Sequence, residues 1–80
     1  MPAAIVLVSC DVGQEDSVAE QMCRLQGVEN VALVYGVYDI VAKLSAETMD
    51  GLEGIIIRKL RAVPGIKATV TLVVSRECPV

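Results

Sequence analysis

Four short apolar runs, separated by two segments of helical periodicity, constrain the fold of this 80-residue chain more than any other feature. The first run, residues 4–10, is rich in β-branched residues and carries no charge, which is typical of a buried strand. Three further runs of similar composition predict strands over residues 30–35, 38–45 and 68–75. We therefore expect one sheet of four strands.

Between the first two runs, residues 14–26 change to a helical period. Val18, Met22 and Leu25 lie on one face of the expected helix, and charged residues fall on the opposite face. Gly27 follows at once and is a natural helix end, because glycine readily adopts the backbone angles that a helix C-terminus needs.

A second helix is expected over residues 47–62, where apolar residues again recur at helical spacing, and Pro64 and Gly65 end this segment. The order of elements is therefore β-α-β-β-α-β, and each half runs from a helix end through a glycine into a strand. This repetition predicts an α+β, ferredoxin-like fold, in which residues 1–80 form a single domain with a four-stranded antiparallel sheet and two helices on one face.

The strands lack the alternation of apolar and polar residues that a sheet with one solvated face should show. Lys43 is the only charge within residues 5–8, 31–34, 40–44 and 70–74. The two helices can cover one face, but a large uncovered apolar face is a recognised liability. A chain of this length also buries only a marginal core by itself. We therefore expect a homodimer in which sheet packs against sheet.

The stretch VYGVYD contains the only two aromatic residues of the chain, Tyr35 and Tyr38. Gly36 and Val37 separate the second and third strands, which is the spacing of a two-residue type II′ hairpin turn. One interpretation is a simple turn whose tyrosines cap the edge of the sheet. The other is a small polar pocket, in which Gly36 allows a ligand to approach the backbone and the Asp39 carboxylate accepts an ammonium group. An amino acid suits such a turn.

The composition argues against several classes of function. The formal net charge is −3, and the Lys and Arg residues do not form the footprint that DNA or RNA binding requires. The chain has no His, and Cys10, Cys23 and Cys78 show no CxxC spacing and no activating partner, so we expect no metal, no cofactor and no clear role for them. No nucleotide-binding motif occurs, and we expect no enzyme activity. No apolar stretch reaches the length of a membrane span, so a cytoplasmic protein is expected.

Three segments together resemble the ligand-binding (RAM) domain of the Lrp/AsnC family of transcriptional regulators: LQGVENV, VYGVYDIVAKL and RKLRAVPGIKATVTLVV. The resemblance implies a domain that dimerises through its sheet and assembles further into octamer-like rings. It also implies that a small effector, usually an amino acid, binds between dimers. The hairpin would form one side of that site and the last strand the other, through Tyr35, Gly36, Val37, Tyr38, Asp39, Thr69 and Thr71.

The apolar Val37 stands where many relatives have a polar residue, which favours apolar effectors. The chain begins at the first strand, as in members that lack the helix-turn-helix. The resemblance therefore implies action by co-assembly with, or modulation of, a full-length regulator. Three alternatives stay open: an ACT-like regulatory module that binds amino acids, a small enzyme of the dimeric α/β-barrel kind, and a purely structural assembly domain.

Overall fold

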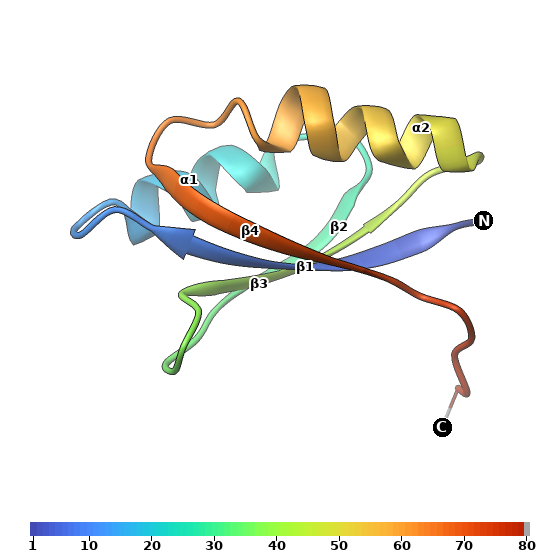
Figure 1. The fold of residues 1–80 in the computed structure, drawn as a ribbon, viewed down its shortest axis with the longest axis horizontal. Coiled ribbons are helices and arrows are strands. Elements are labelled where there is room, and N and C mark those ends of the chain that lie inside the picture. Colours follow the sequence, from blue (N-terminus) through green and yellow to red (C-terminus); the bar gives the residue numbers. More distant parts are fainter. Residues whose placement is uncertain (80) are drawn as a thin grey trace.

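The computed structural model describes residues 1–79 and confirms the predicted β-α-β-β-α-β order (Figure 1). Its elements are β1 (Ala3–Cys10), α1 (Glu15–Cys23), β2 (Val28–Leu33), β3 (Ile40–Ser45), α2 (Met49–Gly54), η1 (Ile55–Leu60) and β4 (Ile66–Val73). None of the helices in this part of the chain is long and apolar enough to cross a membrane.

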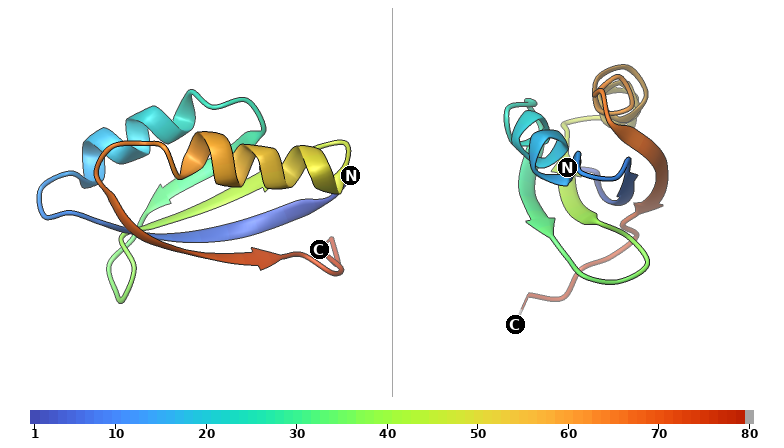
Figure 2. Two further views of the ribbon diagram at one scale, coloured as in Figure 1. Left: turned by 45° about the horizontal axis from the view of Figure 1, so that its top comes forward. Right: turned by 90° about the vertical axis from the view of Figure 1, so that its left-hand side faces the viewer.

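The four strands form one sheet in the order β2-β3-β1-β4, and every neighbouring pair is antiparallel. Both helices lie on the same face of this sheet, as the sequence predicts (Figure 1, Figure 2). β2 and β4 are therefore the two edge strands, and β1 lies between β3 and β4. The predicted ferredoxin-like α+β fold is confirmed.

The hydrophobic core lies between the sheet and the helices. On β1 every second residue is buried, because successive side chains of a strand point to opposite faces. Directly opposed residues share a face, so Val8 lies between Ile40 on β3 and Thr69 on β4. The largest fully buried side chains are Met22, Ile40, Leu44, Leu52, Leu60, Val6, Val8 and Val18.

The second helix consists of an α-helical half and a π-helical half. Thr48 caps its start, where the side-chain oxygen accepts a hydrogen bond from the Gly51 N–H at 3.0 Å. Near its end, the Arg61 N–H donates to the Ile56 carbonyl at 3.1 Å, five residues back. The buried residues Leu52, Ile56 and Leu60 are spaced by four. A pure α-helix would rotate this series away from the core, and the wider π turns bring it back.

The connection between β2 and β3 differs from the predicted two-residue type II′ turn. β2 ends at Leu33 and β3 begins at Ile40, so residues 34–39 form a longer loop. The Val34 N–H still donates to the Asp39 carbonyl at 2.9 Å, but the Asp39 N–H donates to the Val8 carbonyl on β1 at 2.9 Å. The turn prediction is wrong. Asp39 bonds to Val8 of β1 as well as to Val34 of the hairpin, and the regular pairing of β2 with β3 ends at Leu33 and Ile40.

The second face of the sheet carries no helix. Val70 and Leu72 of β4 are exposed there, opposite the half-buried Leu7 and Ile5 of β1. The segment after β4 begins to cross this face, where the Lys43 ammonium lies 2.9 Å from the Glu77 carboxylate. The predicted apolar face is therefore present and open in the single chain, while dimerisation through it stays a prediction.

Candidate functional site

The loop of residues 34–39 extends beyond the sheet, away from both helices (Figure 1). Tyr35 and Val37 are exposed, with 108% and 90% of their reference areas accessible, while Tyr38 and Asp39 are half-buried. At Gly36 the backbone φ is +151°, and a Cβ there would meet nothing within 4 Å. The loop therefore presents an aromatic and an aliphatic side chain to whatever approaches it.

Asp39 fixes the base of this loop. One carboxylate oxygen, Oδ2, accepts a hydrogen bond from the backbone N–H of Cys10 at 2.8 Å. The predicted acceptor for an ammonium group thus also holds the end of β1, a role that no sequence pattern signals because the two residues are far apart in the chain. Burial raises the pKa of the Cys10 thiol above its usual value, and the nearby carboxylates of Asp39, Glu15 and Asp11 raise it further, in that order.

A first cavity of about 420 Å³ lies between this loop and the start of α1. Three carboxylates line it, together with Tyr35 and no Lys or Arg; the lining residues are Glu15, Asp16, Leu33, Val34, Tyr35 and Asp39. The clustered negative charge favours a cationic group such as an ammonium.

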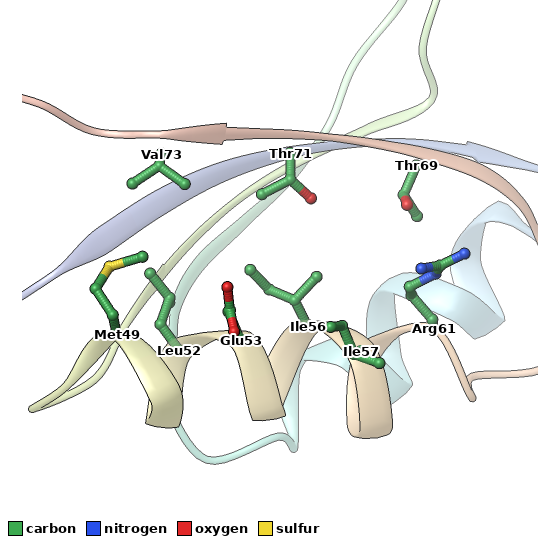
Figure 3. Close-up of a pocket in the computed structure, with 9 residues that line it drawn as sticks. All are labelled: Met49, Leu52, Glu53, Ile56, Ile57, Arg61, Thr69, Thr71 and Val73. Atoms are coloured by element: carbon green, nitrogen blue, oxygen red, sulfur yellow. The ribbon is translucent and has the colours of Figure 1, made fainter.

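A second cavity, a groove of about 350 Å³, lies between the second helix and β4 (Figure 3). It contains the predicted Thr69 and Thr71 and seven residues that sequence reasoning missed: Met49, Leu52, Glu53, Ile56, Ile57, Arg61 and Val73. In the sequence, only Ile57 hints at this groove, because its spacing places an apolar residue off the apolar stripe of the expected helix.

Within one chain, the two groups of predicted site residues do not meet. The loop residues Tyr35 and Asp39 line the first cavity, Thr69 and Thr71 line the second, and no residue lines both. Among residues 1–79, no group of three His, Cys, Asp or Glu side chains is arranged to hold a metal ion. The three cysteines are free thiols, with Cys10 buried and the other two exposed.

Comparison with curated proteins finds transcriptional regulators. An uncharacterised HTH-type transcriptional regulator of Pyrococcus furiosus is 37% identical over 73 residues, which is 88% of this chain and 49% of that protein. One from Pyrococcus horikoshii is 43% identical over 56 residues, or 70% and 37%. This chain thus spans half or less of their length. A homocitrate synthase of Sulfolobus acidocaldarius is 33% identical over 75 residues, or 92% of this chain and 16% of the enzyme.

Comparison with solved structures gives the same fold. A hypothetical protein of Pyrococcus horikoshii has a TM-score of 0.89 at 31% identity, covering 96% of this chain and 93% of that one. A protein of Thermus thermophilus has a TM-score of 0.91 at 26% identity, covering 99% of both chains. A transcriptional regulator of Neisseria meningitidis, solved as a complex with L-Met, shares the fold with a TM-score of 0.85 at 15% identity, covering 98% and 52%.

The sequence pattern of the Lrp/AsnC ligand binding domain matches residues 3–78, almost the whole chain. The quoted segments that carry the resemblance all lie inside this match. The chain therefore belongs to the Lrp/AsnC ligand binding domain family.

Proposed function

We propose that this domain senses a small effector, of the amino-acid class, and that its output is a change in oligomeric state. One observation carries the proposal: the hairpin loop and the two threonines lie in separate cavities of one chain. A site that uses both groups is complete only when the loop of one subunit meets β4 of another. The exposure of Tyr35 and Val37 supports this, because within residues 1–79 both side chains remain open to contact with another subunit.

The basic unit in this proposal is a dimer that buries the open face of the sheet. Ile5, Leu7, Val70 and Leu72 make that face apolar, and Leu72 is 50% exposed in the single chain. Dimers then associate through the loop end of the sheet into a ring. A ligand that binds between dimers, and not to the free dimer, stabilises the ring by mass action.

The charge around the loop supports an amino acid as effector. Glu15, Asp16 and Asp39 surround the first cavity with negative charge, which suits the ammonium group. The related regulator of Neisseria meningitidis, which shares the fold, is solved with L-Met bound. The apolar Val37 on the same loop favours an effector with an apolar side chain.

The output passes to a DNA-binding partner in this proposal. The net charge of −3 does not favour DNA binding, whereas the curated relatives are HTH-type regulators of which this chain matches half or less. Co-assembly with such a regulator, through the same sheet or loop contacts, would couple effector binding to transcription.

Native mass spectrometry, with and without a pool of common amino acids, tests the sensor. We expect an even-numbered assembly that gains up to one amino-acid mass per subunit and shifts toward the larger species. Tyr35→Ala should abolish the shift without unfolding the protein, because Tyr35 is fully exposed. Asp39→Asn is the second variant, since it retains an oxygen acceptor for the Cys10 N–H. An assembly that binds no member of the pool would instead favour a purely structural domain.

A second candidate is a regulatory module that acts on a biosynthetic enzyme. The match to 16% of a homocitrate synthase favours it, because a domain of this kind then occurs as a small part of an enzyme. Affinity capture from native lysate separates the two candidates. Recovery of an HTH-type regulator supports the first, and recovery of a biosynthetic enzyme supports the second.

A further inference from the structure

The open face of the sheet carries two rows of side chains that run across all four strands. Directly opposed residues share a face, so one row, from β4 to β2, consists of Val70, Leu7, Val41 and Ala32. The next row consists of Leu72, Ile5, Lys43 and Asn30. The first row is apolar throughout, and the second has one charged member, Lys43. A second copy that covers this face must therefore cover a cation.

The chain after β4, residues 74–79, forms a strap that turns onto this same face. Figure 1 and Figure 2 show it on the side of the sheet away from the helices. The Val74 N–H continues the pairing with β1 by donating to the Ala3 carbonyl at 2.9 Å. Glu77 then reaches Lys43 on β3, which is the second strand from β4 and roughly 10 Å away across the sheet. The strap thus spans β1.

The Lys43 ammonium and the Glu77 carboxylate form an ion pair, with 2.9 Å between the nitrogen and the oxygen. In the single chain 33% of the Lys43 side chain and 56% of the Glu77 side chain are exposed. The hydrogen bond to Glu77, and then its charge, raise the pKa of Lys43 above its usual value, so the ammonium keeps its proton. A pair this exposed adds little to the stability of one chain, because water solvates both charges almost as well.

Covering the face changes this balance. A lone ammonium moved from water into an apolar interface carries a large desolvation penalty, whereas a paired ammonium keeps a counter-charge and a hydrogen bond. Glu29 on β2 also raises the pKa of Lys43, but less than Glu77 does, and its carboxylate accepts a hydrogen bond from the Ser45 hydroxyl. Glu77 is therefore the acid placed to neutralise Lys43 when the face is buried.

We infer that the strap and the open face form one interaction surface for a second copy of this chain, in which Glu77 neutralises Lys43 so that the face can be buried. The inference rests on the sheet-to-sheet dimer of the proposed function and goes beyond it, because it makes the strap part of the interface. Each subunit brings the counter-ion for its own cation, and two-fold symmetry places two such pairs in the dimer. The apolar rows of the second copy supply the uncharged surface that this arrangement requires.

Exchanging the charges in the full 80-residue chain tests the inference. Glu77→Lys brings two ammonium groups together on the face, and Lys43→Glu brings two carboxylates together. Each should raise the dimer dissociation constant, measured by sedimentation equilibrium, about 100-fold. The double variant, Lys43→Glu with Glu77→Lys, restores opposite charges and should return to within about fivefold of the wild type. Glu77 is exposed and lies beyond β4, so circular dichroism should show an unchanged fold in Glu77→Lys.

The chain contains a matched control on its helix side. The Arg24 guanidinium lies 2.8 Å from the Glu20 carboxylate, and both side chains are exposed. Arg24→Glu, Glu20→Arg and their combination make the same charge exchanges on the side that the dimer leaves in water. All three should leave the dimer dissociation constant unchanged.

Three results would overturn the inference. One is an effect below about fivefold for both single exchanges, because an ion pair that stays in water contributes no more than that factor. Another is tighter dimerisation of Glu77→Lys, which would show that the strap competes with the second copy. The third is a double variant as weak as the single exchanges, because opposite charges would then not be the cause.

The same measurements separate the strap from the sensor. If Leu72→Lys dissociates the dimer while Glu77→Lys does not, the sheet dimer stands and the role of the strap fails. If the single exchanges weaken the dimer and the double variant restores it, but no amino acid changes the oligomer mass, the strap stands and the sensor fails. A wild type that stays monomeric with and without amino acids would overturn both.

Discussion

The carboxylate of Asp39 accepts a hydrogen bond from the backbone N–H of Cys10 at 2.8 Å, although 29 positions of sequence separate the two residues. The Asp39 N–H also donates to the Val8 carbonyl, so the side chain and the backbone of Asp39 both hold the end of β1 to the hairpin loop. These bonds fix the base of the loop, whereas Tyr35 and Val37 near its tip are exposed.

Removing this side chain should destabilise the fold. In Asp39→Ala the half-buried Cys10 N–H loses its acceptor, and we expect a loss of about 1–3 kcal/mol in the free energy of unfolding. Asp39→Asn keeps an oxygen at the same position and should lose less than half as much. Urea denaturation followed by circular dichroism measures both. Equal losses for the two variants would show that the negative charge, and not the hydrogen bond, is what matters.

Sequence reasoning predicted the elements, their order and the open sheet face, because these depend on local patterns. The period of Val18 and Met22, for example, needs no knowledge of the partner surface to indicate a buried helix face, and both residues are fully buried. The open face follows in the same way from strands that are apolar at successive positions, such as Leu7 and Val8.

The features that were missed depend on contacts between distant segments. Gly36 and Val37 fit a two-residue turn locally, but the bonds from Asp39 to β1 determine where the strands end. The π-helical turns and the groove likewise depend on how Ile56 and Leu60 reach a core that the sheet shapes. Arg61 carries no local signal of a site, since a charged residue at a helix end is common.

A side chain at Gly27 should destabilise the fold strongly. This residue joins α1 to β2 with a φ of +95°, and an added Cβ would overlap Ile55 Cδ1 and lie 3.0 Å from the Ser45 carbonyl oxygen. Gly13 is the matched control, with a φ of +83° and open space around it. Thermal unfolding should show a loss of about 1–2 kcal/mol for Gly13→Ala, from the backbone alone, and about 2–4 kcal/mol for Gly27→Ala. Equal losses would mean that the helix end shifts to relieve the contact.

The three thiols should differ in reactivity. Cys23 and Cys78 are exposed, whereas Cys10 is buried and its thiol pKa is raised by burial and by the Asp39, Glu15 and Asp11 carboxylates. Since the thiolate is the reactive form, titration with Ellman's reagent at pH 8 should label two thiols quickly and the third roughly 100-fold more slowly. Three equally fast thiols would contradict the structure around Cys10.

The raised pKa of Cys10 also predicts a pH dependence of stability. The folded protein holds this proton more tightly than the unfolded chain, for which the usual thiol pKa is 9.0. The resulting stability is fully present below pH 9.0 and is lost as the pH rises toward the higher pKa of the folded state. Urea midpoints measured from pH 8 to pH 10.5 should fall more steeply for the wild type than for Cys10→Ala. The same slope in both would assign the effect to other groups.

The last prediction concerns the open face of the sheet. Leu72 and Thr71 are neighbours on β4 whose side chains point to opposite faces, Leu72 to the open face and Thr71 to the helix side. If two subunits pack sheet against sheet, Leu72→Lys places an unpaired charge in that interface. It should raise the dimer dissociation constant at least about 100-fold and leave a folded monomer, as measured by light scattering and circular dichroism. Thr71→Lys adds the same charge to the same strand on the other face and should stay dimeric. A dimer in both variants would move the interface away from the sheet, and a monomer in Thr71→Lys alone would place it on the helix side.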